Sequence, residues 1–157
     1  MTNESYDNMP DNLGDPKTDA EVLELYIQGL AAAEGITGEH PAIANSYSNI
    51  AMAYLNQGYP TTALEWFKKA VAMYERVSGD HSDTAFACNS VAGVYFRQED
   101  YGEALLWCLK SYRILLRLKD RHPDIGTIKK RMKTTYHEAG FTEPFEQWLK
   151  RMLDSDR

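Results

Sequence analysis

The stretch HPAIANSYSNIAMAYLNQGYPTTALEWFKKAVAMYERVSGD, residues 40–80, decides the fold, because the chain repeats its pattern over residues 81–121 and again from residue 122. Histidine opens each of these three segments, and the only tryptophans in the chain recur with the same spacing of 41 residues. These markers are His40, His81, His122, Trp66, Trp107 and Trp148. Two residue types that share one period indicate an internal repeat, which is typical of architectures built by stacking one structural unit.

Each segment predicts a pair of helices. From about Pro41 to Gln57, small and apolar residues recur at intervals of three and four, which is the period of a helix buried on one face. Gly58-Tyr59-Pro60 interrupts the pattern, and a second helix is expected from about Thr61 to Val77, before Gly79. The repeated unit is therefore predicted to be a helical hairpin.

Both ends of the chain depart from this unit. An earlier helix is expected from about Ala20 to Glu34, and its Val22-Leu23 aligns with Ala63-Leu64, so it matches the second helix of a pair. The last segment has Lys133 and Phe145 where the earlier segments have alanine, which suits a terminal repeat with one face in water. The predicted fold class is all-α, a solenoid of about seven helices made of a half repeat and three helix pairs.

Three regions follow from these limits. Residues 1–19 contain proline, glycine and more acidic than basic side chains, a composition typical of a flexible acidic tail. Residues 20–153 are predicted to form the repeat domain, and residues 154–157 a short C-terminal tail.

Two helix starts show a capping-box pattern. Thr18 followed by Glu21 predicts the start of the first helix, and Asp100 followed by Glu103 predicts the start of a later one. In this motif each of the two side chains satisfies a backbone amide that the first helical turn leaves without a partner.

These segments resemble the tetratricopeptide repeat, which has an aromatic residue, Leu-Gly and Tyr in its first helix, then Ala, an aromatic residue and Ala in its second. The long period and the joints around each histidine are similar to those of the kinesin-light-chain subtype. The resemblance covers about Ala20 to Leu153 and implies a right-handed α-solenoid that binds proteins. In the first unit the matching residues are Tyr47, Ile50, Ala51, Tyr54, Ala63, Phe67 and Ala70.

Composition narrows the range of partners and locations expected for this chain. The 157 residues include 17 basic and 23 acidic side chains, and the net charge of −6 argues against non-specific binding of nucleic acid. No apolar run reaches the roughly 20 residues needed to span a bilayer, and the N-terminus lacks the features of a secretory signal. The expected location is the cytoplasm, with no membrane or nucleic-acid partner and no cofactor.

In this family the first helices of the pairs line the concave side of the solenoid, which is the usual binding surface. The resemblance therefore implies a peptide-binding groove along the first helix of each pair. The predicted contact residues are Asn45, Ser48, Asn49, Met52, Asn56, Phe86, Asn89, Ser90, Phe96, Arg97, Lys130 and Arg131.

The chemistry of these residues suits an extended, acidic peptide. The Asn49 and Asn89 amides can pair with the backbone of a peptide, since each is both donor and acceptor. Arg97, Lys130 and Arg131 add positive charge that attracts acidic side chains or a terminal carboxylate. The clamp that some family members use for a free carboxylate is incomplete here, because Ser48 and Met52 stand where it has Lys and Asn. Alternatively, these polar residues are no more than a solvated helix face.

Two other functions stay open. The first is self-assembly into a homodimer, because the half-repeat helix has apolar residues that a missing partner helix would leave partly uncovered. The second is autoinhibition, in which the acidic tail reaches into the basic part of the groove. The apolar residues of the half-repeat helix, on which the first of these functions depends, are Leu23, Tyr26, Ile27 and Leu30.

Catalysis is not expected, because the repeat brings no cluster of titratable residues together. The periodic histidines are predicted to cap the joints, since stacked pairs lie roughly 10 Å apart and zinc needs its donors at about 2 Å. Cys88 and Cys108 are expected as small core side chains rather than a redox pair. The tryptophans are expected to pack in the core.

Overall fold

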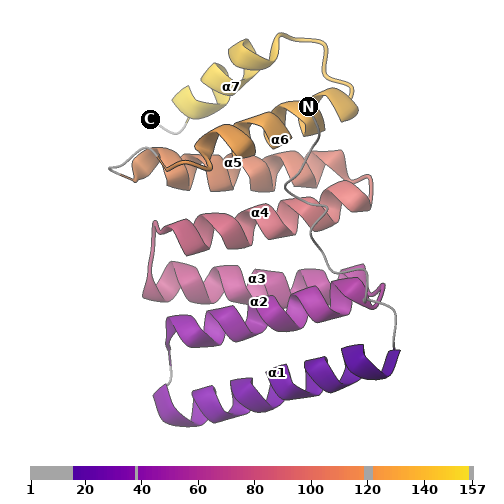
Figure 1. The fold of residues 1–157 in the computed structure, drawn as a ribbon. Coiled ribbons are helices and arrows are strands. Elements are labelled where there is room, and N and C mark those ends of the chain that lie inside the picture. The colour runs from indigo at the N-terminus through magenta and orange to yellow at the C-terminus, as the bar shows by residue number, and fades with distance from the viewer. Residues whose placement is uncertain (1–15, 38, 119–121, 156–157) are drawn as a thin grey trace.

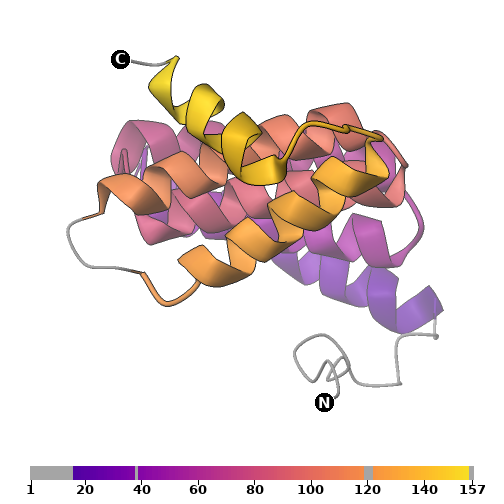
Figure 2. The same cartoon turned by 90° about the horizontal axis from the view of Figure 1, so that it is seen from above.

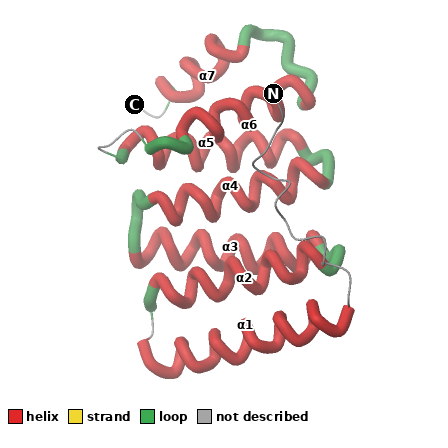
Figure 3. The backbone as a smooth tube through the Cα atoms, in the orientation of Figure 1, coloured by secondary structure: helices red, strands yellow, loops and turns green. Residues whose placement is uncertain are grey.

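The computed structural model describes residues 16–37, 39–118 and 122–155, which form seven helices and no strand. The helices stack in chain order (Figure 1), and successive helices run in opposite directions, because the connections between them lie on alternating sides of the stack (Figure 3). This confirms the predicted all-α solenoid of a half repeat and three pairs. The helices are α1 Pro16–Thr37, α2 Pro41–Asn56, α3 Pro60–Val77, α4 Ser82–Arg97, α5 Tyr101–Arg117, α6 Ile125–Glu138 and α7 Phe145–Asp154.

The periodic histidines act at the joints, as predicted. His40 Nδ1 accepts the Ala42 N–H at 3.1 Å at the start of α2, and His81 Nδ1 accepts the Asp83 N–H at 3.3 Å at the start of α4. His122 Nδ1 accepts the Asp124 N–H at 3.3 Å before α6. The 41-residue spacing of histidine therefore marks the entry to each helix pair.

The two capping-box predictions differ in outcome. Asp100 is the N-cap of α5, and its Oδ1 accepts the Glu103 N–H at 3.2 Å, which is one half of the predicted box. The Asp100 N–H donates to the Tyr95 carbonyl oxygen at 3.0 Å instead of to the Glu103 side chain. The prediction for Thr18 is wrong, because α1 begins at Pro16 and Thr18 lies inside it. Proline suits a first helical turn, since its missing N–H would have no partner there. The rest of the predicted acidic tail, residues 1–15, lies outside the described residues.

The core runs between the helix layers and depends on small residues. Four of these small residues are fully buried, namely Ala51, Ala63, Ala104 and Cys108. Their size lets neighbouring helix axes approach closely. The fully buried Ser111 hydroxyl donates to the Ala85 carbonyl oxygen at 2.7 Å and so joins α5 to α4. Cys88 and Cys108 are buried in this core, as predicted.

The first helix is better covered than the sequence indicated. Leu30 is buried, and Leu23 and Tyr26 pack partly buried against the core, so the expectation of an uncovered face is wrong for Leu30. The large apolar side chains that α1 does expose are Leu25, at 65%, and Ile27, at 38%.

The last pair closes the stack with aromatic rings. The fully buried Tyr136 of α6 packs against Phe141, Phe145 and Trp148, with ring centroids 4.8, 5.5 and 5.0 Å away. Helix α7 lies obliquely across the end of the stack (Figure 2). Trp148 is thus in the core as predicted.

The other two tryptophans are only half buried. Lys69 Nζ lies 4.1 Å from the Trp66 ring centroid, and Lys110 Nζ lies 5.0 Å from that of Trp107. A lysine ammonium over an aromatic face interacts favourably with it. The core prediction is therefore correct in part for these two rings.

Candidate peptide-binding face

Helices α4 and α6 share one face of the molecule and are joined there by two predicted contact residues. The Arg131 guanidinium of α6 donates through Nη1 to Asn89 Oδ1 of α4 at 3.0 Å, and it approaches the Asn89 carbonyl oxygen at 3.4 Å. The same guanidinium lies over Gly93, where a Cβ would be in ordinary contact with Nη1 at 3.6 Å. Asn89 and Arg131 thus form one unit rather than two independent contacts.

A cavity of about 210 Å³ lies between the N-terminal halves of helices α2 and α4. Four predicted residues line it, namely Asn45, Ser48, Phe86 and Ser90. Three further residues were not predicted: Tyr74, Asp83 and Ala87. Tyr74 was missed because it belongs to the second helix of its pair, although an antiparallel hairpin must bring the end of α3 beside the start of α2. Asp83 is three residues before Phe86 and so shares its helix face.

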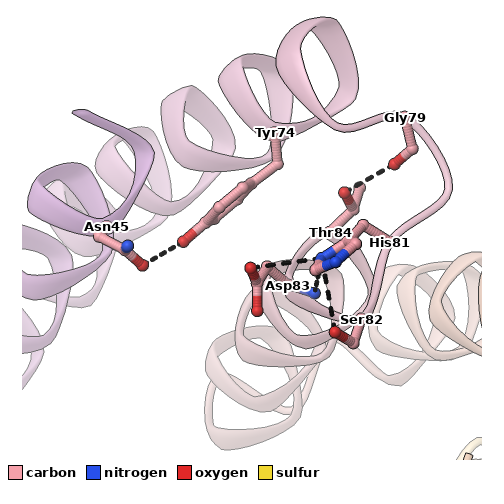
Figure 4. Close-up of polar contacts among 7 residues, drawn as sticks. All are labelled: Asn45, Tyr74, Gly79, His81, Ser82, Asp83 and Thr84. Carbon is pink, nitrogen blue, oxygen red and sulfur yellow. Dashed lines mark hydrogen bonds and ion pairs between the residues drawn. The ribbon is translucent and has the colours of Figure 1, made fainter. Parts of the chain in front are cut away.

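The wall of this cavity is fixed by hydrogen bonds within the protein. The Tyr74 hydroxyl donates to Asn45 Oδ1, which ties α3 to α2 (Figure 4). The Ser90 hydroxyl donates to the Phe86 carbonyl oxygen at 3.1 Å. Burial raises the pKa of Tyr74, and the nearby negative charge of Asp83 raises it further. The phenol is therefore neutral and keeps its proton for Asn45.

The twelve predicted contact residues all reach the surface. Ser48, Asn89, Ser90, Phe96 and Arg131 are half buried, and the other seven are exposed. Met52 is 41% exposed and Phe86 43%, so both present apolar surface to water. Phe96 is partly engaged, because its ring packs edge-on against Tyr101 of α5 with centroids 5.3 Å apart.

Positive charge increases along this face. Helix α2 has no charged residue, whereas α2, α4 and α6 together have five basic and two acidic residues in a chain of net charge −6. Lys129 Nζ is paired with Glu146 of α7 at 2.8 Å. Within the described part of the chain, the exposed side chains of Arg97 and Lys130 make no ion pair or hydrogen bond.

The two cysteine thiols are titratable groups of the buried core. Burial raises the pKa of Cys88 to about 12 and that of Cys108 to about 11, so both thiols stay protonated near neutral pH. Over residues 16–37, 39–118 and 122–155, no three His, Cys, Asp or Glu side chains are grouped as a metal site would require. In the same residues no helix is both long enough and apolar enough to cross a membrane.

Comparison with known proteins identifies the repeat. The family model described as "Tetratricopeptide repeat" matches residues 20–76 and 42–117. No curated protein matches the sequence.

Solved structures share the fold. The crystal structure of BtubC (BKLC) from P. vanneervenii superimposes with a TM-score of 0.74 over 88% of this chain and 58% of that one, at 19% identity. Nearly identical TPR-like repeats of a presumed kinesin light chain from Podosopora anserina give a TM-score of 0.66 over 79% of this chain and 60% of that one, at 23% identity. This chain thus spans less than two thirds of either structure.

Proposed function

This chain belongs to the tetratricopeptide repeat family, and we propose that it binds an extended acidic segment of a partner protein along the face of α2, α4 and α6. Repeat solenoids of this type generally mediate protein–protein interaction. The observation that favours an acidic segment is the pair of exposed cations, Arg97 and Lys130, which have no partner among the described residues.

Charge supports this choice of ligand. The three helices have an excess of basic residues although the whole chain is acidic, so an acidic segment is attracted to this face and repelled elsewhere. Arg97 can bind a carboxylate with two parallel hydrogen bonds, and Lys130 can bind one as a point charge. The Asn89–Arg131 pair adds a third cationic group held in place.

The rest of the face supports an extended backbone. The exposed amides of Asn49 and Asn56 each offer a donor and an acceptor to the peptide groups of a ligand. Exposed Met52 and Phe86 offer apolar contact that does not depend on ligand charge. The buried, reduced Cys88 and Cys108 thiols agree with a cytoplasmic location for this binding.

A peptide-binding experiment tests the proposal. Fluorescein-labelled peptides with a run of glutamates, with free or amidated C-termini, would be titrated with the protein at two salt concentrations. We expect the Arg97→Ala/Lys130→Ala double variant to lose about tenfold in affinity at low salt and less at high salt. An equal affinity for the peptides with free and amidated C-termini would show that side-chain carboxylates are bound rather than the terminus.

The matched control removes two other exposed lysines. Lys69→Ala/Lys150→Ala, on α3 and α7 outside the proposed face, takes the same charge from the protein but leaves Arg97 and Lys130 in place. Its affinity should stay within about twofold of that of the parent protein. If both double variants weaken binding equally, the attraction comes from overall charge and the proposed face is wrong.

The alternative function is self-assembly through α1. Leu25 and Ile27 are exposed on this first helix, and burying them against a second copy would remove apolar surface from water. Light scattering at high concentration would then give twice the monomer mass of 17.9 kDa, and Leu25→Glu would return the protein to a monomer. A monomer at all concentrations would rule this alternative out.

A further inference from the structure

The cavity between α2 and α4 differs in chemistry from the cationic end of the face. Among the residues that line it, the one formal charge is the carboxylate of Asp83. No lysine, arginine or histidine in the described part of the chain lines the cavity, whereas Lys130 and Arg131 lie one helix pair further along the stack. The face that we propose for an acidic peptide therefore has one end of the opposite polarity.

Hydrogen bonds within the wall make the cavity rich in acceptors. The Tyr74 hydroxyl gives its proton to Asn45 Oδ1, and the Ser90 hydroxyl gives its proton to the Phe86 carbonyl oxygen. Each hydroxyl oxygen then offers only lone pairs to a ligand. Together with the Asp83 carboxylate, three of the lining side chains can accept hydrogen bonds but have no proton to donate.

The neighbouring histidine does not neutralise Asp83. His81 Nδ1 lies 3.3 Å from Asp83 Oδ2, but the same nitrogen accepts the Asp83 N–H at 3.3 Å (Figure 4). A nitrogen that accepts this bond has no proton to share with the carboxylate. The negative charge of Asp83 stays available to a ligand.

Phe86 supplies an apolar wall for the same ligand. Its ring is 43% exposed and is backed by the His122 ring, with centroids 5.8 Å apart and the planes nearly perpendicular. An aromatic face next to a carboxylate suits a cation on an aliphatic stem, because the stem packs on the ring while the charged head reaches the oxygens.

We infer that this cavity binds a lysine or arginine side chain of the same peptide that we propose for the α2, α4 and α6 face. A lysine side chain has five heavy atoms of roughly the size of a water molecule, on the order of 150 Å³ in all. It fits the volume of about 210 Å³. The inference rests on the proposed function and deepens it, because the ligand must then be basic at one point and acidic at another.

The stacking of the helices sets the spacing between the two parts of the ligand. The cavity and Lys130 lie about one to two helix spacings apart, on the order of 10–20 Å. An extended chain covers about 3.3 Å per residue, so about three to six residues separate the basic side chain from the acidic run.

Peptides that differ in one charge test the inference. Each has a glutamate run and, four residues from it, either lysine or Nε-acetyl-lysine, which keeps the aliphatic stem but removes the charge. We expect the lysine peptide to bind about three- to tenfold tighter. Asp83→Asn should abolish this preference, so that the two peptides bind equally.

The matched control is Asp124→Asn. Asp124 is equivalent to Asp83 by the 41-residue period and makes the same local contact, with its Oδ2 3.5 Å from His122 Nδ1, but it does not line the cavity. This variant should keep the lysine preference. If it loses the preference as Asp83→Asn does, or if the parent protein binds both peptides equally, the inference is wrong.

The two proposals fail in distinguishable ways. Loss of affinity in Arg97→Ala/Lys130→Ala without any lysine preference would leave the acidic-peptide function standing and overturn the cavity inference. A lysine preference together with an overall affinity that does not fall when the glutamate run is replaced by glutamine would support the cavity and contradict the acidic-peptide function.

A small probe makes the test independent of peptide design. The ¹⁵N-labelled protein would be titrated with n-butylammonium and, separately, with n-butanol. We expect saturable shift changes for the amides of Ser48, Ala87 and Ser90 with the ammonium alone, and none in Asp83→Asn. Equal changes with n-butanol would show a purely apolar pocket, and no change at these amides would also overturn the inference.

Discussion

The middle pair, α4 and α5, and the last pair, α6 and α7, occupy equivalent positions in the repeat but are packed differently. In the middle pair the contact is made by small residues, and the Ser111 hydroxyl reaches the Ala85 backbone at 2.7 Å. In the last pair the contact is made by rings around Tyr136. Small residues let two helices approach closely, whereas aromatic rings keep α7 further away and oblique (Figure 2).

This difference follows from position in the stack. The middle pair is covered on both sides, so both of its helices need close, regular surfaces. The last pair has no described pair beyond it, and large rings close the core from one side while α6 presents cations to water. The same repeat pattern therefore supports a rigid frame in the middle and a specialised surface at the end.

The largest test of this comparison is the removal of the central ring of the last pair. Tyr136→Ala should lower the free energy of unfolding by about 3–5 kcal/mol, because it leaves a cavity among three aromatic rings. It also removes the hydroxyl that donates to the Glu143 carbonyl oxygen at 2.9 Å. Urea denaturation followed by circular dichroism measures the change.

The matched variant in the middle pair is Tyr95→Ala, 41 residues earlier. Tyr95 is half buried, and its hydroxyl accepts a hydrogen bond from Lys68 Nζ at 2.8 Å. Its loss should cost about 1–2 kcal/mol. Equal losses for the two tyrosines would show that the last pair is not closed by its aromatic cluster.

The next largest test places a residue of the last pair at the equivalent position of the middle pair. The fully buried Ser111 is equivalent to the half-buried Met152 of α7. Ser111→Met should destabilise the protein by about 1–3 kcal/mol, since the close approach of α5 to α4 has no room for it. The control is Ser155→Met, at an exposed site after α7, which should be neutral. A neutral result for Ser111→Met in thermal unfolding would contradict the close packing.

A smaller effect is expected at the turn inside each pair. This turn needs a left-handed residue, with φ of 82° at Gly58 and 78° at Gly140, but the middle pair has Glu99 at 60°. Glu99→Gly should stabilise the protein by about 0.5–1 kcal/mol, because a side chain is disfavoured in this conformation.

Two further variants check that explanation by thermal unfolding. Glu99→Ala should give little or no gain, since alanine also has a Cβ. Gly140→Ala should destabilise the last pair by about 1 kcal/mol. A gain from Glu99→Ala as large as that from Glu99→Gly would point to the charge rather than the backbone.

The smallest effect concerns the uncharged start of the binding face. Ser48 is equivalent to Lys130 by the 41-residue period. Ser48→Lys should raise the affinity for an acidic peptide about threefold at low salt, and the gain should vanish at high salt. Fluorescence anisotropy measures it, and an unchanged affinity would mean that the ligand does not extend over α2.

The repeat, the order of the helices and, to within one residue, the ends of α2 and α3 could be predicted from the sequence. The period of histidine and tryptophan marks the units, and Gly58-Tyr59-Pro60 marks a turn that the structure also has. The start of α1 could not be predicted correctly, because a plausible cap at Thr18 competes with Pro16 as a helix start. A local capping pattern does not indicate which of two possible helix starts is favoured by packing against the neighbouring helices.

The sequence could predict that Asn89 and Arg131 lie on one side of the molecule, but not how they are engaged. The period places Asn89 and Arg131 on one side, yet their hydrogen bond depends on the distance between α4 and α6. The cavity residues Tyr74 and Asp83 were missed because the sequence pattern treats each helix separately. Contacts between the end of one helix and the start of another depend on the packing angle, which no periodicity specifies.

From α1 to α6, each helix makes its most extensive contacts with the helices that precede and follow it within this series. A nascent polypeptide of this kind does not have to wait for a distant segment before a new helix can pack. Each helix that leaves the ribosome already meets its partner, and the cost of closing long loops is avoided. The described helices can therefore assemble in the order of their synthesis, with α7 and its aromatic rings added after α6.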